Sequence, residues 1–107
     1  MAKVCDFCGA PDPTWVYPAS DFIVILDGCQ IANSRSGWEA CEICHALIES
    51  GDSKAFDIHC VDSIILANVG LIHNVDWCRQ CVLAIHKQFF AHRQGPAQQA
   101  EVTLANS

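Results

Sequence analysis

A small α+β domain is the fold class that this sequence predicts, with short strands before residue 41 and about three helices after it. Two observations favour it. The first forty residues are interrupted by prolines and glycines and contain short apolar runs, a pattern typical of strands and turns. From Cys41 onward, apolar residues recur at steps of three and four, which is the period of a helix. A chain of 107 residues has the length of one domain.

The strand region is divided by turns. Prolines before residue 14 oppose helix formation, and residues 14–17 read as a short strand that ends at Pro18. Residues 22–26 form a continuous apolar run rich in β-branched side chains, which predicts a buried strand. The polar residues 33–37 can then turn the chain back toward the second half.

Three helices are expected after the strands. The first covers residues 41–50 and ends at Gly51, which can take the left-handed conformation that follows many helices. The second begins at Asp52 or Ser53, either of which can cap it, and runs to about residue 68.

The third helix is expected from Asn74, as its cap, to about residue 94. It has the most regular apolar stripe in the chain, formed by Val75, Cys78, Val82, Ile85 and Phe89. A glycine-proline pair then stops it. We therefore expect a single domain over residues 1–94, whose helical part is 54–94, and a flexible tail over 95–107.

Two C-x-x-C pairs predict a metal site. Cys5 and Cys8 are followed by Gly9, the shape of a zinc knuckle, in which a tight turn points backbone N–H groups at sulfur. Cys41 and Cys44 fall where strands give way to helix, and the free N–H groups at a helix start stabilise thiolates. A knuckle, a hairpin and a helix carrying the other two ligands make a treble-clef-like arrangement. We expect one Zn²⁺ on these four cysteines, with residues 1–53 as the treble-clef part.

Disulfide formation is the alternative to metal binding, and it needs an oxidising compartment. Residues 1–6 lack the apolar core of a signal peptide, and no run of about eighteen apolar residues is present to span a membrane. We therefore expect a reducing, cytoplasmic location without membrane association, where thiols bind metal.

Three other interpretations of the cysteine pairs stay open. The thiols can be ordinary buried side chains, although four at this spacing rarely serve packing alone. Residues 41–45 also match C-x-x-C-H, the attachment string of c-type haem, which leaves Cys5 and Cys8 unexplained. A dithiol redox site is the third, but no thioredoxin-like βαβ pattern surrounds either pair.

A second metal site is conceivable on the later helices. Its candidate ligands are Cys60, Cys78, Cys81 and His86. Against it, Cys78 already belongs to the apolar stripe of the third helix, which favours a core position. Cys29 has no evident partner.

Catalysis is not expected. His45 is expected to pack or cap rather than bind metal. His59, His86 and His92 are expected at or near helix surfaces, without the paired carboxylates or nucleophiles that acid–base catalysis needs. No phosphate-binding glycine loop and no H-E-x-x-H motif occurs. A site with four cysteine ligands is also coordinatively closed, which is typical of structural zinc.

Four segments resemble a group of small, poorly characterised treble-clef-type zinc-finger proteins of actinobacteria and their bacteriophages. They are CDFCG at 5–9, P-x-W-x-YPA-x-DF at 13–22, W-x-AC-x2-CHALIE-x-GD at 38–52 and FFAHR-x-GP at 89–96. The resemblance supports the four ligands and implies a bacterial or phage-infected cytoplasm. It does not extend over residues 54–81 and implies no activity.

A non-enzymatic protein-interaction module is the function we expect, in a phage or bacterial regulator that acts on a host protein. A nucleic-acid-binding regulator is the first alternative, but a net charge of −6 and six Lys and Arg residues disfavour it. A self-associating structural protein, such as a homodimer, is the second. Trp77 and Phe90 lie off the apolar stripe of the third helix, so we expect them to form a partner surface.

Overall fold

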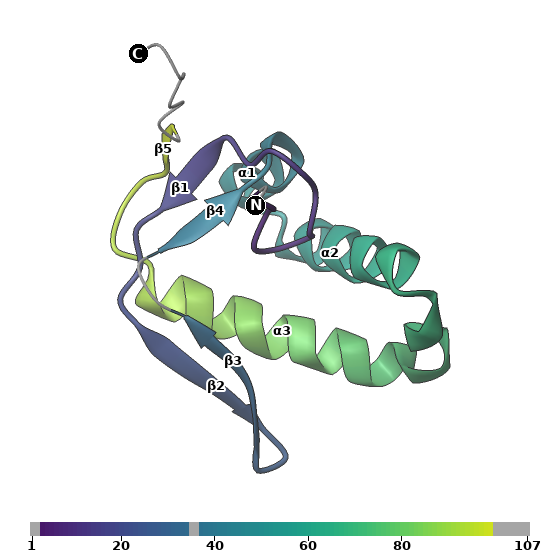
Figure 1. Ribbon diagram of the computed structural model, residues 1–107. Coiled ribbons are helices and arrows are strands. Elements are labelled where there is room, and N and C mark those ends of the chain that lie inside the picture. Colours follow the sequence, from purple (N-terminus) through teal and green to yellow (C-terminus); the bar gives the residue numbers. More distant parts are fainter. Residues whose placement is uncertain (1–2, 35–36, 100–107) are drawn as a thin grey trace.

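The described part of the chain forms two small antiparallel sheets and three α-helices, whose arrangement is drawn in Figure 1. The computed structural model describes residues 3–34 and 37–99. The strands are β1 (Trp15–Tyr17), β2 (Phe22–Leu26), β3 (Cys29–Ser34), β4 (Trp38–Ala40) and β5 (Gln98–Gln99). The helices are α1 (Glu42–Ser50), α2 (Ser53–Ala67), the 3-10 helix η1 (Val69–Asn74) and α3 (Val75–His92). The predicted class, a small α+β domain of treble-clef-like order, is confirmed, and its four clustered cysteines could bind zinc.

The first sheet has the strand order β4-β1-β5, so β1 is its centre. Tyr17 of β1 lies opposite Trp38 of β4, and both side chains are buried. Gly37 precedes β4 with φ of +92°, and a Cβ there would come within 2.8 Å of the Tyr17 carbonyl oxygen. Glycine is therefore required for this close approach of two backbones.

The segment 95–107, expected as a tail, contributes to this sheet. Gln98 and Gln99 pair with β1, which gives β1 a hydrogen-bonded neighbour on both sides. Residues 100–107 lie outside the described residues.

The second sheet is the β2–β3 hairpin, joined by Asp27 and Gly28, which both have positive φ. The sequence predicted a buried strand at 22–26, and this is corrected in part. Val24 is buried, whereas Ile23 and Ile25 are 55% and 65% exposed. The hairpin packs on α3 with one face, so every second side chain of β2 faces outward.

The helix limits follow local capping chemistry. Asp52 caps α2, since its carboxylate accepts a hydrogen bond from the Ala55 N–H at 3.0 Å. Asn74, the expected cap of α3, makes no side-chain capping hydrogen bond, because η1 leads directly into α3. No helix of the described residues is long and apolar enough to cross a membrane.

Phe7 is the centre of the core. It comes from the knuckle, yet its ring contacts Trp38 at 5.0 Å, Phe56 at 5.3 Å and Phe89 at 4.9 Å between ring centroids. These rings belong to β4, α2 and α3. The metal-binding part and the helical part of the chain therefore share one hydrophobic core.

Candidate metal centre

The knuckle is a tight hairpin closed by main-chain hydrogen bonds. The Cys5 N–H donates to the Ala10 carbonyl at 2.7 Å, and the Gly9 N–H donates to the Cys5 carbonyl at 2.9 Å. Gly9 has φ of +83°, a conformation that glycine adopts without strain. This turn places the sulfurs of Cys5 and Cys8 on one side of the loop.

The helix supplies the other two sulfurs. Cys41 follows β4 directly and is the N-cap of α1, and its sulfur accepts from the Cys44 N–H at 3.4 Å. The positive end of the helix dipole lies at this point and favours a thiolate. The positions of Cys41 and Cys44 therefore depend on a few adjacent residues, as do those of Cys5 and Cys8.

Asp6 joins the two halves of the site. Its N–H donates to the Glu39 carbonyl at 2.8 Å, and its carboxylate accepts from the Glu39 N–H at 2.7 Å. Glu39 lies in β4, two residues before Cys41. The knuckle is therefore anchored to the strand that leads to the other ligands.

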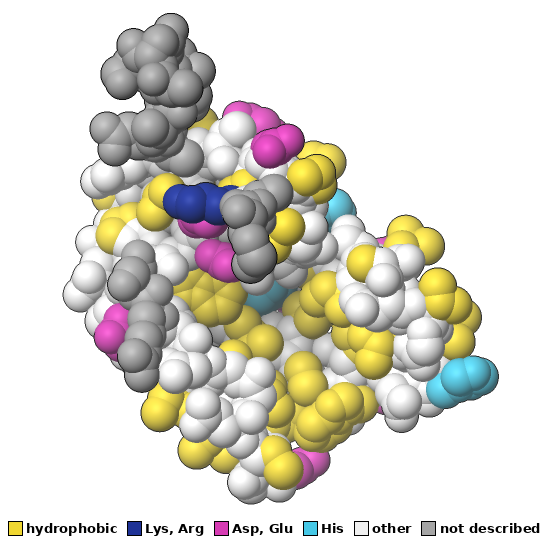
Figure 2. Space-filling model, in the orientation of Figure 1, with side chains coloured by type: hydrophobic (Ala, Val, Ile, Leu, Met, Phe, Trp, Pro, Cys, Tyr) yellow, Lys and Arg dark blue, Asp and Glu magenta, His cyan; other side chains and the backbone are white. Residues whose placement is uncertain are grey.

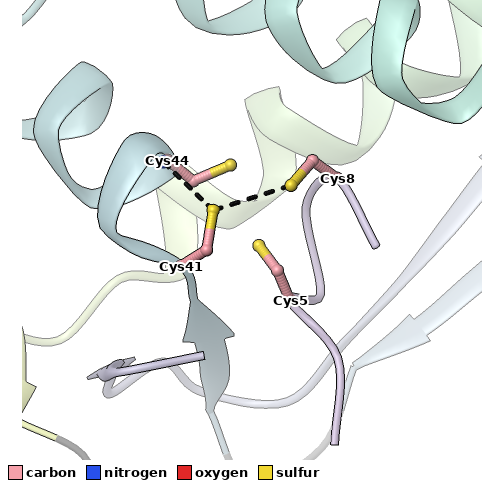
Figure 3. Close-up of side chains that lie close together, drawn as sticks. All are labelled: Cys5, Cys8, Cys41 and Cys44. Atoms are coloured by element: carbon pink, nitrogen blue, oxygen red, sulfur yellow. Dashed lines mark hydrogen bonds between the residues drawn. The ribbon is translucent and has the colours of Figure 1, made fainter. Parts of the chain in front are cut away.

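The four predicted ligands, Cys5, Cys8, Cys41 and Cys44, come together as free thiols, and Figure 3 shows their sulfurs pointing toward a common centre. All four sulfurs lie within 4.8 Å of one another, and those of Cys8 and Cys41 are 3.6 Å apart. A tetrahedral ion with metal–sulfur bonds of about 2.3 Å requires sulfurs about 3.8 Å apart. The group therefore has the size and donor set of a metal-ion site.

The electrostatics of the four buried thiols favour a bound cation. The hydrogen bond with Cys44 lowers the pKa of Cys5 to about 4. Burial raises the pKa of Cys8 to about 12, and the neighbouring Cys5 and Cys60 raise the pKa of Cys44. Four buried sulfurs so close together cannot all ionise by themselves, because like charges repel. A divalent cation removes this conflict, and metal-bound thiols are deprotonated.

The second metal site allowed by the sequence is not assembled. Cys60, Cys78, Cys81 and His86 do not form a group of neighbouring donor atoms, and among the described residues only the first cluster does. Cys81 and His86 are five residues apart on α3, so they project about 140° apart around the helix axis. They therefore face different neighbours.

A three-residue constellation that sequence reasoning missed lies beside the metal site. Nδ1 of His86 is 2.5 Å from Oδ1 of Asp57, and the His86 ring stacks on Phe56 at 4.2 Å between centroids. Interactions with Cys44 and then His86 lower the pKa of Cys60 to about 7. His86 is twenty-nine residues from Asp57, so no local motif could have connected them.

His45 packs as expected, because its ring stacks on Trp15 at 3.8 Å with an angle of 10° between the planes. Nδ1 of His45 is 3.0 Å from the hydroxyl of Tyr17, which donates to Glu49 at 2.7 Å. Cys29 is exposed at the start of β3.

Trp77 and Phe90, the expected partner surface, are 40% and 41% exposed. They do not form one patch, because thirteen residues separate them on α3 and they project about 140° apart. Phe90 contacts Phe56 and Phe89 with its ring edge and lies toward α2. Each of the two aromatic residues must therefore be considered separately.

The knuckle, the β1–β4 pair and the start of α1 together define an α+β domain with a four-cysteine site that could hold a metal ion. Comparisons of the chain with protein-family models, curated proteins and solved structures gave no match. The site and the surface of this molecule are therefore the basis on which its function is inferred.

Proposed function

We propose that this protein is a zinc-binding protein-interaction module without enzymatic activity. Four thiolates in a tetrahedral arrangement suit Zn²⁺, and a site with no open coordination position is structural. The observation that carries the interaction role is an apolar groove between α2 and α3.

The α2–α3 groove has a volume of about 350 Å³. Its apolar floor and walls include Ile58, which is 52% exposed, and Leu83, which is 44% exposed. Phe90 lies seven residues after Leu83 on the same side of α3 and borders the neighbouring hollow beside Phe56. Exposed apolar side chains along one groove are typical of protein contact sites.

Charges of both signs border the groove. Lys54 and Asp62 lie along the α2 edge, and Arg79 lies along the α3 edge. A partner with a row of aliphatic side chains flanked by charged ones matches this pattern, and an amphipathic helix provides it. Figure 2 shows further hydrophobic side chains, with few charged ones, over the end of the molecule where α2 meets α3.

The buried state of Cys60 supports a non-enzymatic role. Cys60, His86 and Asp57 have the residue types of a cysteine nucleophile, a base and an orienting acid. However, Cys60 has no exposed surface and lies beside the metal ligand Cys44. A substrate has no access to this thiol.

Pairing of the basic residues supports a protein partner over nucleic acid. Arg79 binds Asp76 at 2.8 Å, and Arg93 is 3.4 Å from Glu49. Two of the three cations on or next to α3 therefore face a carboxylate, which reduces their attraction for phosphates.

The test compares two variants, each of which replaces one exposed aliphatic side chain by glutamate. Leu83→Glu changes the groove, whereas Ile23→Glu changes the outer face of β2. If the chain comes from an actinobacterium or its phage, as the resemblance implies, a lysate of such a bacterium supplies the partner. We expect the parent and Ile23→Glu to retain the same bound proteins, and Leu83→Glu to lose them with unchanged zinc content.

Other outcomes decide against the proposal. Equal capture by both variants excludes the groove as the contact site. A dimer that Leu83→Glu abolishes would favour self-association, and submicromolar, sequence-selective nucleic-acid binding at about 150 mM salt would favour the first alternative.

A further inference from the structure

Two of the charged side chains that line the α2–α3 groove already have partners within the molecule. Arg79 donates to the carboxylate of Asp76 at 2.8 Å. The carboxylate of Asp57 is 2.5 Å from Nδ1 of His86. These internal contacts reduce what Arg79 and Asp57 can offer to a bound partner.

Lys54 and Asp62 are the other two charged side chains of the groove. Both are exposed, and neither forms an ion pair with another described residue. They lie eight positions apart on α2, which is about 12 Å along the helix axis. Ile58 lies midway between them and is 52% exposed, and residues four apart follow one side of a helix. The α2 edge of the groove therefore has a positive end, an apolar middle and a negative end.

The α3 edge is mainly apolar. Val75 and Leu83 line the groove, and Phe90 lines the neighbouring hollow. Fifteen positions separate Val75 from Phe90, which is about 22 Å along α3. A helix of about four turns has this length, and its apolar face can lie in such a groove.

We propose that the groove binds an amphipathic helix with an acidic residue opposite Lys54 and, about two turns away on the same flank, a basic residue opposite Asp62. This inference rests on the proposed function and adds the charge pattern of the partner. Charges at the rim of an interface select the right partner, since like charges placed there repel each other. Because both side chains are exposed, salt should weaken this selection.

The test uses three synthetic helices of about sixteen residues, each held helical by a lactam link on its outer face. All three have the same row of aliphatic residues. They differ only at two positions, eight residues apart on one flank, which carry Glu and Lys, Glu and Glu, or Lys and Lys. Affinities are measured by fluorescence anisotropy with the zinc-loaded protein.

The protein variants are Lys54→Glu and Asp62→Lys. Lys87→Glu is the matched control, because Lys87 is exposed on α3 outside the groove and its replacement changes the net charge as Lys54→Glu does. Zinc content and thermal melting check that each variant folds.

We expect the parent to bind the Glu–Lys helix about three- to tenfold more tightly than the other two, at low salt. Lys54→Glu should prefer the Lys–Lys helix, and Asp62→Lys should prefer the Glu–Glu helix. Lys87→Glu should keep the preference of the parent. At about 1 M salt the preferences should disappear while binding through the apolar row remains.

An order of preference that is the same in the parent, Lys54→Glu and Asp62→Lys would overturn the inference. So would a change of preference in Lys87→Glu equal to that in Lys54→Glu, because net charge alone would then explain it. In either case, loss of binding in Leu83→Glu would leave the groove as the contact site. Binding that Leu83→Glu does not weaken, or no binding of any helix, would contradict both the groove and the charge pattern.

Discussion

The knuckle and the helices hold their cysteines by different means. Cys5, Cys8 and Cys41 are fixed by backbone hydrogen bonds and by a turn or helix cap within a few residues. Cys60 and Cys78 are fixed by the rotation of whole helices and by the rings packed around them. Local sequence therefore suffices to recognise ligands in the first part, whereas in the second part tertiary contacts decide what each cysteine does.

Phe7 connects the two parts. It stands between two ligand positions, and its ring lies between those of α2, α3 and β4. Metal binding and helix packing should therefore stabilise each other, although they depend on different interactions. The following predictions test how far the two parts are coupled.

Cys41→Ser should have the largest effect. It removes one ligand and the cap of α1, and metal binding contributes on the order of 10 kcal/mol or more to folding in small zinc peptides. We expect loss of bound zinc and of the cooperative thermal transition, measured by elemental analysis and circular dichroism. Cys29→Ser, at an exposed position of β3, is the control and should melt like the parent. A parent-like melting curve for Cys41→Ser would show that the cysteines do not hold the fold.

Phe7→Ala should have the next largest effect on stability. Phe7 is 4% exposed, and truncation of such a core ring costs about 3–5 kcal/mol. Because Phe7 joins both parts, zinc affinity should fall together with the free energy of unfolding, measured by denaturant titration with saturating zinc. If stability falls while zinc affinity stays that of the parent, the two parts are not coupled through this ring.

The double variant Trp77→Ala with Phe90→Ala should lower the free energy of unfolding by less than Phe7→Ala does. Both side chains are about 40% exposed, and only Phe90 contacts core rings. Denaturant titration of each single variant should show the larger loss for Phe90→Ala. A loss equal to that of Phe7→Ala would place these side chains in the core and leave them no role as a surface.

Tyr17→Phe should have the smallest effect, about 1–2 kcal/mol at neutral pH, because it removes a hydroxyl that donates to Glu49 and also contacts Nδ1 of His45. Burial and the bond to Glu49 raise the pKa of Tyr17. Its contribution is therefore fully present below pH 10, near the value of an unfolded tyrosine, and is lost as the pH rises through the folded-state pKa. Unfolding free energies at pH 8 and above pH 10 should show the difference between parent and variant shrinking. A difference that grows with pH would contradict this assignment.

Prediction from the sequence succeeded where structure is local. The C-x-x-C-G string specifies a knuckle, Asp52 caps α2, and Gly51 ends α1 in the left-handed conformation. Prediction failed where contacts with residues far along the chain decide the burial or the cap of a segment. The run 22–26 is half exposed because α3 covers only one face of the hairpin, and Asn74 is not a cap because η1 precedes α3.

The sequence by itself determined the four ligands and the order of strands and helices, because backbone turns and helix starts depend on a few adjacent residues. Only the tertiary structure decided the roles of the remaining cysteines and of the aromatic residues. Cys60 lies beside Cys44 and His86 because α2 and α3 pack with particular faces together, and that rotation is set by side chains from every element at once. The same packing places Phe7 at the centre of a core that its position between two ligands does not reveal.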